Sequence, residues 1–296
     1  MLFERQRLLL ALLEALGGSA GDLDFEMLLF LYCQEPDAGR PYEFVPHERG
    51  PFSFTAYADR RKLIERGFLA EDDRRWKLTD QGRAAISRAQ RPQVTAFARR
   101  FRGTRGDALV AETYRRFPYV ATRSELAAHV LHGDAAALAR IEAARPVAKA
   151  AAVSTIGYEG RALEGYLDTL LRAGVTLLCD VRRNPHSHKY GFSKGTLARC
   201  CDGVGIRYEH LPELGIASEQ RKGLTTQADY DALFAGYERT YLPGQTRSLA
   251  KIAGWVHAGE RVALTCYELL PQHCHRHYVA RALERKYGEA FAASDL

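Results

Sequence analysis

Two uninterrupted apolar runs most constrain the fold of the C-terminal half of the chain. Residues 175–182 read VTLLCDVR, in which Leu177, Leu178 and Cys179 form the first run, and Val262, Ala263 and Leu264 form a second run between turn-forming residues. A strand that is apolar at every position is buried on both faces, which is typical of a parallel sheet covered by helices. A helical pattern separates the first run from an earlier β-branched segment, VSTIGYEG. We therefore expect βαβ units and a mainly parallel sheet for residues 151–296.

The last of these strands leads into a concentration of reactive side chains. Cys266 and Glu268 follow the apolar run, and Cys274, His275 and Arg276 begin the next helical pattern. A loop that leaves the carboxyl end of a parallel strand and enters a helix is where open α/β sheets bind ligands. The positive end of the helix dipole favours a thiolate, so we expect a lowered pKa for Cys274. The alternative is that both cysteines are buried packing residues.

Polar side chains also follow two other predicted strands. Gly157 and Tyr158 end the first strand, and Asp180 and Arg182 end the second. In a parallel sheet these ends lie at one edge, so we expect the side chains to line one pocket. Tyr158 would stack on a planar ring or donate a hydrogen bond to it, whereas Asp180 and Arg182 could instead form an ion pair that closes the edge. The loop that follows adds two binding candidates, Ser187 and Lys189.

These segments resemble the domain of unknown function 488 family, whose members share a TxGY opening, a DVR strand end, a GFS turn and a C-x-E-x-x-P-x-x-C-H-R ending. The corresponding positions here are 155–158, 180–182, 191–193, Cys266, Glu268, Pro271 and 274–276. One position departs from the family pattern, since Ile216 stands beside Gly215 where a second glycine is expected. The resemblance covers about residues 153–288 and implies an α/β domain without naming an activity.

The motifs that the sequence lacks exclude several classes of catalytic site. The sequence contains no Gly-rich phosphate loop, GxSxG elbow or HExxH motif. A phosphatase or rhodanese loop needs a strand-terminal cysteine followed by a tight cradle of amides that ends in arginine. Cys266 stands at such a strand end, but Arg276 follows ten residues later and the intervening ELLPQHCH contains no glycine. The residue types suit acid–base catalysis and recognition of a polar ligand instead.

We therefore predict two sets of site residues at this edge of the sheet. The catalytic candidates are Tyr158, Asp180, Glu268 and Cys274. The substrate-binding candidates are Gly157, Arg182, Ser187, Lys189, Cys266, His275 and Arg276. Glu268 or Asp180 would act as a general base or stabilise a developing cation. Arg182, Arg276 and Lys189 would hold a phosphate or the edge of a base.

No metal site and no cofactor are expected from the sequence. Cys266, Cys274, His275 and His277 are the nearest set of zinc ligands, but their spacing matches no standard tetrahedral pattern. The six cysteines include no CxxC pair. A chain of this size without an export signal needs no disulfide framework, so we expect reduced thiols.

The N-terminal half has an uneven charge distribution. The chain carries a net charge of +6. Residues 1–50 contain 4 basic and 9 acidic side chains, whereas residues 51–123 contain 17 basic and 8 acidic ones. This asymmetry predicts a surface for a polyanion within the basic stretch.

The basic stretch contains RRKLIERGFLAEDDRRWKLTDQGR, which resembles a winged helix-turn-helix domain. A basic helix ends at Gly67, and two short apolar segments around Leu69 and Leu78 flank a charged turn as a hairpin. The resemblance implies DNA binding through six residues, Arg60, Arg61 and Lys62 on the helix and Arg74, Arg75 and Lys77 on the wing. Winged helices also serve as protein-contact modules, and a run of charges can be a solvated face.

The chain is expected to contain a mostly α winged-helix domain at 1–90, a helical connector at 91–150 and an α/β domain at 151–296. No apolar run approaches the roughly 20 residues of a membrane span. The N-terminal segment lacks the small-residue pattern of a cleavage site, so we expect no membrane partner and a cytoplasmic protein. A homodimer is left open.

The combined hypothesis is a DNA-binding protein whose α/β domain acts on nucleic acid at the base or glycosidic level, as a hydrolase or a glycosylase-like enzyme. DNA is expected as the partner in preference to RNA. Two alternatives stay open. One is a transcriptional regulator that senses a small anionic ligand without turnover, and the other is a thiol-dependent sulfur or phosphate transferase.

Overall fold

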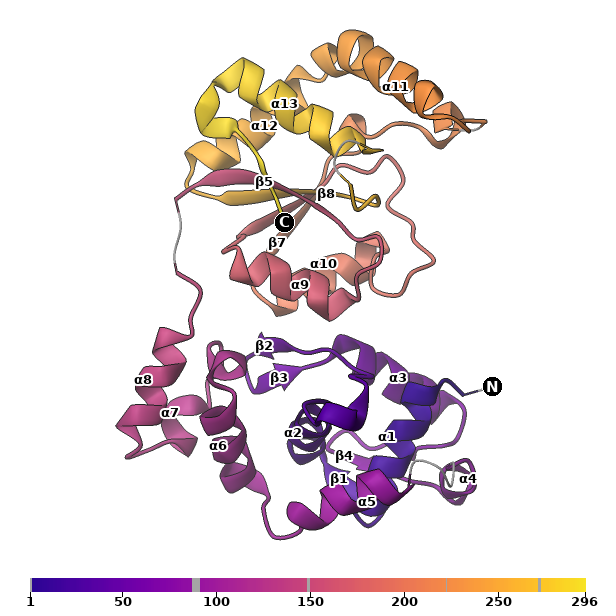
Figure 1. The fold of residues 1–296 in the computed structure, drawn as a ribbon, viewed down its shortest axis with the longest axis vertical. Helices are drawn as coiled ribbons and strands as arrows, with labels where there is room; N and C mark the ends of the chain where they lie inside the picture. The colour runs from indigo at the N-terminus through magenta and orange to yellow at the C-terminus, as the bar shows by residue number, and fades with distance from the viewer. Residues whose placement is uncertain (1, 87–90, 148–149, 222, 271–272) are drawn as a thin grey trace. The chain divides into compact units, whose positions relative to one another are not determined.

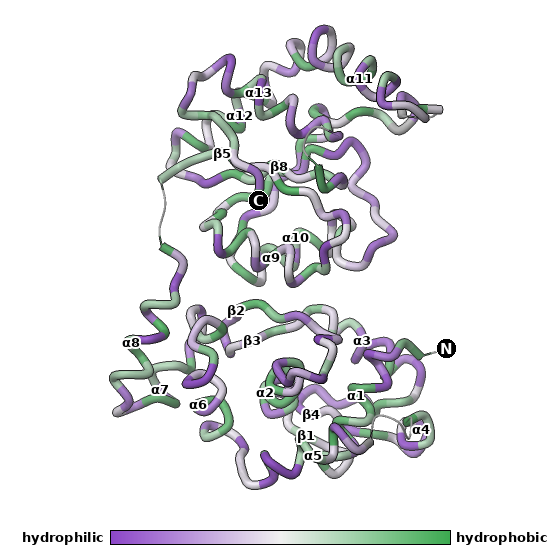
Figure 2. Tube along the Cα trace, viewed as in Figure 1, coloured by the Kyte–Doolittle hydropathy of each residue, from purple (hydrophilic) through white to green (hydrophobic). Residues whose placement is uncertain are grey.

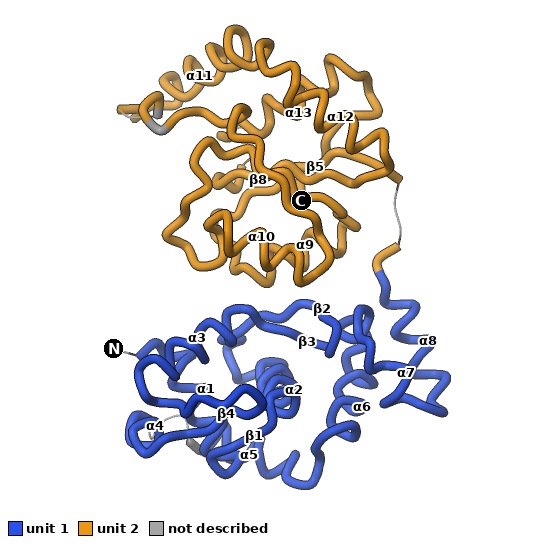
Figure 3. The backbone as a smooth tube through the Cα atoms, turned by 180° about the vertical axis from the view of Figure 1, so that it is seen from behind, with its two compact units in different colours: residues 1–145 blue, residues 146–296 orange. Residues whose placement is uncertain are grey.

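The chain forms two compact units, residues 1–145 and 146–296 (Figure 3). The computed structural model describes residues 2–86, 91–147, 150–221, 223–270 and 273–296. Pro271, quoted above for the family motif, lies outside the described residues. The boundary between the units falls inside the predicted connector, and the two units are described separately below.

The first unit is built around one apolar helix. Its first half comprises α1 (Glu4–Ala15), β1 (Ser19–Gly21), α2 (Asp22–Cys33), β2 (Val45–His47), β3 (Gly50–Phe52), α3 (Phe54–Glu65), β4 (Arg75–Lys77) and α4 (Asp80–Ala84). The sequence of α2, DLDFEMLLFLYC, is apolar on nearly every side, and nine of its twelve residues are buried. A helix of this composition is stable only when other elements surround it. Helix α1 and strands β1, β3 and β4 contact it.

A small sheet follows α3, as the sequence predicts. Leu69 and Leu78 pair in an antiparallel bridge, and β4 pairs with β1 on its other side. The side chain of Ser53 accepts a hydrogen bond from the Ala56 amide at the start of α3, and Thr79 accepts one from the Gly82 amide at the start of α4. These caps satisfy amides that have no partner within the helix, so they fix where α3 and α4 begin.

The segment predicted as a connector belongs to the first unit. Its helices are α5 (Arg91–Arg100), α6 (Gly106–Arg116), α7 (Ala127–Val130) and α8 (Ala135–Ala143). Phe97 of α5, Val110 of α6 and Ile141 of α8 are buried in the same hydrophobic cluster as α1 and α2. A shared core makes these helices part of one folding unit.

The second unit is an α/β domain with a five-stranded parallel sheet, which confirms the expected fold class. Its elements are β5 (Ala152–Gly157), α9 (Leu163–Arg172), β6 (Leu177–Asp180), α10 (Lys194–Gly203), β7 (Arg207–His210), α11 (Gln227–Gly236), α12 (Thr246–His257), β8 (Arg261–Cys266), α13 (His275–Tyr287) and β9 (Ser294–Asp295). The strand order is β7-β6-β8-β5-β9. The edge strand β9 was not predicted, because two residues at the C-terminus carry no periodic signal.

Helices cover both faces of this sheet. Figure 1 shows α9 and α10 on one face and α12 and α13 on the other. Figure 2 shows strands β5 and β8 as largely apolar, whereas the helices alternate between hydrophilic and hydrophobic residues. Leu177, Val262 and Leu264 are completely buried in the core between the layers. The uninterrupted apolar runs therefore reflect burial of the strands from both sides.

The two central loops of the sheet diverge. The loop after β6 leads to α10 on one face, and the loop after β8 leads to α13 on the opposite face (Figure 1). Because β6 and β8 are neighbours, their diverging loops leave a crevice at the carboxyl edge of the sheet. Such a switch in direction is the expected ligand site of an open parallel sheet.

Within the part of the chain that the structure describes, every helix is too short or too polar to cross a membrane.

Candidate functional site

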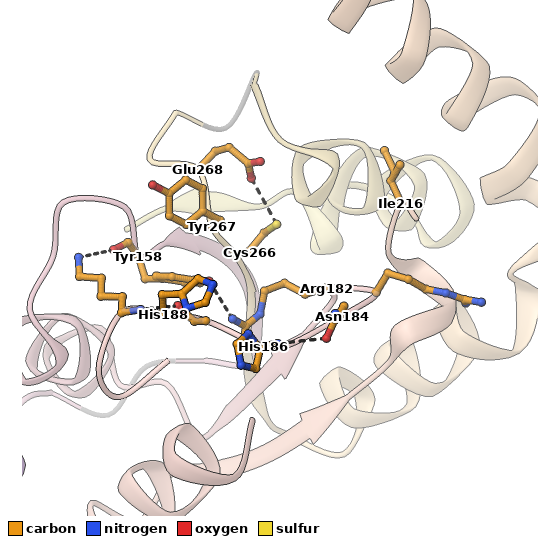
Figure 4. A pocket seen from close by; sticks show the side chains of 12 residues that line it. Tyr158, Arg182, Asn184, His186, His188, Ile216, Cys266, Tyr267 and Glu268 are labelled. Atoms are coloured by element: carbon orange, nitrogen blue, oxygen red, sulfur yellow. Dashed lines mark hydrogen bonds between the residues drawn. The ribbon is translucent and has the colours of Figure 1, made fainter. Parts of the chain in front are cut away.

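A cavity of about 480 Å³ occupies the carboxyl edge of the sheet (Figure 4). Its lining comprises Tyr158 after β5, seven residues of the segment 182–189 after β6, Ile216, Cys266 as the last residue of β8, and the next two residues, Tyr267 and Glu268. Its volume lies in the range of roughly 300 to 1,000 Å³ that is usual for small-molecule sites. The predicted convergence of three strand ends is therefore present in the structure.

The predicted site residues divide into two groups. Six line the cavity, namely Tyr158, Arg182, Ser187, Lys189, Cys266 and Glu268. Five others lie outside its lining, namely Gly157, Asp180, Cys274, His275 and Arg276. Ile216, the residue that departs from the family pattern, is part of the wall.

Asp180 is a buried partner of Arg182. Its carboxylate is completely buried and accepts hydrogen bonds from the Arg182 amide at 3.0 Å, the Arg182 Nε at 2.8 Å and the Tyr208 hydroxyl at 2.6 Å. These bonds occupy both carboxylate oxygens. The ion-pair alternative thus describes Asp180 better than the predicted catalytic role, because a carboxylate that is already bonded and buried cannot reach a ligand.

Arg182 fixes the floor of the cavity. One guanidinium nitrogen donates to the Tyr158 hydroxyl and to the Phe192 carbonyl, each at 2.9 Å. The ring of Tyr158 stacks on Phe192 with centroids 4.3 Å apart, and only 3% of Tyr158 is exposed. Burial and the Phe192 contact leave Tyr158 little freedom to stack on a ligand, in contrast to the prediction.

Tyr267 is the more accessible of the two tyrosines in the cavity, and it was not among the predicted site residues. It is 46% exposed and meets Tyr158 edge to face at 5.3 Å. The next residues, Leu269 and Leu270, are also about half exposed. The sequence does contain a signal for Tyr267, because large apolar side chains directly follow a strand that ends at the carboxyl edge of the sheet, where ligands bind.

The loop after β6 brings cations and imidazoles to the rim. Ser193 holds this loop, because its hydroxyl accepts from the Ser187 amide at 3.1 Å and donates to the Ser187 carbonyl at 2.9 Å. The Lys189 ammonium donates to the Tyr158 carbonyl at 3.1 Å. Partial burial lowers the pKa of Lys189, and the charge of Glu159 opposes this effect. Four further lining residues of this loop were not predicted as site residues, Arg183, Asn184, His186 and His188.

Arg276 and Gly157 position the loop after β8. The guanidinium of Arg276, 1% exposed, donates to the backbone carbonyls of Glu268 and Leu269. A Cβ atom on Gly157 would lie 1.9 Å from the Glu268 carbonyl oxygen, so only glycine permits this approach. Both residues were predicted to bind substrate. Their contacts instead hold the backbone that carries the Glu268 side chain.

The comparison with known families supports the resemblance found in the sequence. The family model described as Domain of unknown function DUF488 matches residues 162–283. The second unit carries a DUF488 domain. The match includes the cavity loops after β6 and β8 and ends within α13. No curated protein matches the chain.

The DUF488 domain also contains a buried cluster of potential metal ligands beside the cavity. The Sγ atoms of Cys266 and Cys274 and a ring nitrogen of His275 all lie within 4.8 Å of one another. The Cys266 thiol donates toward Glu268 Oε2 at 3.3 Å. Burial raises the pKa of Cys274 well above its usual range, and the Cys266 and Glu268 groups add to the effect while Arg276 opposes it. The predicted lowering of this pKa is therefore wrong, because Cys274 is buried.

Outside the DUF488 domain, five of the six predicted DNA-binding side chains are exposed, namely Arg61, Lys62, Arg74, Arg75 and Lys77. Arg60 differs from them. Its guanidinium donates to the carbonyls of Asp72 and Arg75, lies 3.8 Å from the Asp22 carboxylate and is only 12% exposed. It also lies over the ring of Trp76. These contacts tie α3 to the hairpin, so Arg60 stabilises the first unit and is not placed to contact a ligand.

Proposed function

We propose that this protein binds DNA through its first unit and acts on a nucleobase or its glycosidic bond in the cavity of the DUF488 domain. The observation that carries the proposal is the position of Glu268. Its carboxylate lines a polar cavity that also holds the Lys189 ammonium and the exposed ring of Tyr267. A carboxylate, a cation and an accessible aromatic face are the groups that recognise and transform a nucleotide.

Each part of a nucleotide finds a suitable group in this cavity. The phosphate would meet Lys189 and the exposed Arg183. The base would stack on Tyr267, because aromatic rings bind the faces of all bases. Glu268 and Asn184 offer hydrogen-bonding groups for the edge of the base.

Glu268 is the best candidate for a general base. The Arg276 guanidinium and the close approach of Gly157 hold the backbone of Glu268 in place. These contacts fix the point from which its carboxylate extends into the cavity. It can accept a proton from a water that attacks the base or the sugar carbon. The transferase alternative is weaker, because Cys266 and Cys274 are each 1% exposed and the sequence between them contains no glycine, which a tight amide cradle favours.

The order of elements supports DNA binding by the first unit. Helix α3 is followed by an antiparallel hairpin whose second strand pairs with β1, the order expected of a winged helix. Arg61 and Lys62 lie on the exposed side of α3, and Arg74 and Lys77 lie on the hairpin. Exposed cations on a helix and an adjacent wing can contact the phosphates of one duplex.

Replacing Arg61, Lys62, Arg74 and Lys77 together by alanine should weaken duplex binding. The slope of log affinity against log salt should become shallower by about 0.9 for each phosphate that the variant no longer neutralises. Fluorescence anisotropy with a labelled duplex at several salt concentrations measures both quantities. The matched control replaces Arg116 and Arg140, two exposed arginines on other helices of the same unit. A wild-type chain with no affinity at low salt would contradict this part of the proposal.

Nucleoside monophosphates should bind the cavity, and Lys189→Ala should weaken their binding about tenfold or more, because a charge-assisted hydrogen bond contributes about 1.5–3 kcal/mol. Titration calorimetry with each nucleoside monophosphate, and with ribose 5-phosphate alone, tests this and separates base from phosphate recognition. Lys194→Ala is the control, since Lys194 is exposed on α10 and does not line the cavity. Equal affinities for ribose 5-phosphate and every nucleotide would show that the cavity ignores the base.

A further inference from the structure

We infer that Cys266, Cys274 and His275 form a binding site for a divalent transition metal ion, with Zn²⁺ as the best fit, in the wall of the cavity. This inference stands on the geometry of the three side chains and does not depend on the proposed function. The spacing of these residues along the chain is unlike that of standard zinc motifs and predicts no metal site. In the folded domain, however, the three side chains lie close enough together to bind one ion.

The distances between the side chains suit tetrahedral coordination. Cys266 Sγ lies 3.7 Å from His275 Nδ1. With Zn–S near 2.3 Å and Zn–N near 2.1 Å, a sulfur and a nitrogen bound to one tetrahedral zinc ion lie about 3.6 Å apart. The three ligand atoms all lie within 4.8 Å of one another and all three residues are buried. An ion could therefore bind with only small adjustments of the side chains.

The hydrogen bond on the far side of the imidazole orients His275 as a ligand. His275 Nε2 lies 2.9 Å from the Val181 carbonyl oxygen. A carbonyl can only accept, so Nε2 carries the proton, and in the neutral ring Nδ1 directs its lone pair toward Cys266. Histidines that bind metal commonly donate their other N–H to a backbone carbonyl or a carboxylate in this way. The ring is completely buried, which keeps this orientation.

The backbone positions of the three residues make the cluster rigid. Cys266 is the last residue of β8, Cys274 precedes the first turn of α13, and His275 is the first residue of that helix. Ligands on a strand end and a helix start keep their geometry better than ligands on a mobile loop. Because the strand and the helix meet at the edge of the sheet, residues whose spacing fits no standard motif become neighbours. His277, which the sequence analysis grouped with them, is not part of the cluster.

The chemistry of the ligands selects the metal. Two thiolates and an imidazole favour Zn²⁺ over Mg²⁺ or Ca²⁺, which prefer oxygen ligands. Three protein ligands are the usual number in a zinc site that keeps a fourth position for water or substrate. Cys266 lines the cavity, and Glu268 Oε2 lies 3.3 Å from its sulfur. The fourth position would therefore be beside Glu268, where a bound water could also contact the carboxylate.

Titration of the reduced, chelator-treated full chain with Co²⁺ tests the site. Co²⁺ bound by thiolates in a tetrahedral site gives a charge-transfer band in the near ultraviolet and visible d–d bands, neither of which depends on enzymatic activity. We expect one Co²⁺ per chain, displaced by Zn²⁺. Cys266→Ser and Cys274→Ser should each reduce the charge-transfer band, and each of the two substitutions and His275→Ala should weaken binding by about a hundredfold or more.

Two control variants make the test specific. Cys200→Ser replaces a buried cysteine of the same domain outside the cluster and should leave the spectrum unchanged. Glu268→Gln should keep the charge-transfer band even if it loses turnover, which separates metal binding from the proposed catalytic role. Circular dichroism of each apo variant establishes that it is folded.

Two results would overturn the inference. One is a wild-type chain without a thiolate charge-transfer band, whether the thiols stay free or form a Cys266–Cys274 disulfide after purification under reducing conditions. The other is a band of equal strength and affinity in folded Cys274→Ser or His275→Ala, which would exclude the three-ligand assignment.

Discussion

Glu268→Gln is expected to lower turnover by about 10² to 10⁴-fold, the usual contribution of a general base, while the affinity for DNA is retained. Glutamine keeps the size of the side chain and its hydrogen bonding but cannot take up a proton from water. The contacts that hold this segment come from Arg276 and involve the backbone carbonyl of Glu268, so the loop should keep its place. DNA affinity depends on the first unit in this account and should not change.

The matched control for this variant is Glu213→Gln. Glu213 is an exposed glutamate of the same unit and does not line the cavity. It should keep wild-type turnover. Turnover is measured at saturating DNA, and affinity is measured separately by anisotropy. A Glu268→Gln variant with wild-type turnover would remove Glu268 from the chemistry, and one that loses turnover only through DNA affinity would assign it to binding.

Asp180→Ala is expected to destabilise the DUF488 domain by about 3–5 kcal/mol, because it leaves the buried guanidinium of Arg182 without its partner. The side chain of Arg182 is only 6% exposed, and Asp180 is completely buried. The substitution should also release Tyr158 and the floor of the cavity, which Arg182 holds through its other hydrogen bonds.

Hydrogen exchange in peptides from β6 and β8 measures the stability of this unit within the full chain, as a function of denaturant. Glu209→Ala is the control, since Glu209, on β7 of the same sheet, forms an ion pair with the half-exposed Lys251 of α12. Such surface pairs contribute only about 0–1 kcal/mol. If Asp180→Ala costs no more than Glu209→Ala, the buried pair is not what holds the cavity floor.

The sequence predicted the parts of this fold that carry a periodic signal. The apolar runs of β6 and β8 require burial on both faces, and this requirement is enough to predict a parallel sheet and the edge at which its strands end. Tyr158, Arg182 and Glu268 were placed in one pocket by that argument alone, and all three line the cavity.

The sequence could not distinguish residues whose side chains face the cavity from residues whose side chains support the loops around it. Arg276 was predicted to bind substrate because guanidinium groups bind anions, but it binds two backbone carbonyls of the loop after β8. The path of that loop has no periodic pattern, so the direction of Arg276 could not be deduced. The pKa of Cys274 was predicted from the helix dipole, and its burial could not be read from a polar segment.

Arg60 is a case in which the signal was present but not used. Tyr57 and Ile64 lie on the apolar stripe of α3, and Arg60 lies between them at helical spacing. A residue on that stripe faces the interior of the unit, whereas Arg61 and Lys62 face solvent. Charge alone does not distinguish the three residues, because all of them are cationic.

The central claim is that the cavity transforms a nucleobase, and analysis of DNA after incubation with the full chain tests it most directly. Duplexes with natural, modified and damaged bases are incubated with the wild-type chain and with Glu268→Gln. Released bases and the nucleosides of the digested DNA are then quantified by mass spectrometry. The account predicts an altered or released base with the wild-type chain that is absent with Glu268→Gln. An unchanged base composition across the whole panel, together with a DNA affinity that responds to a small anionic ligand, would contradict it and favour a regulator without turnover.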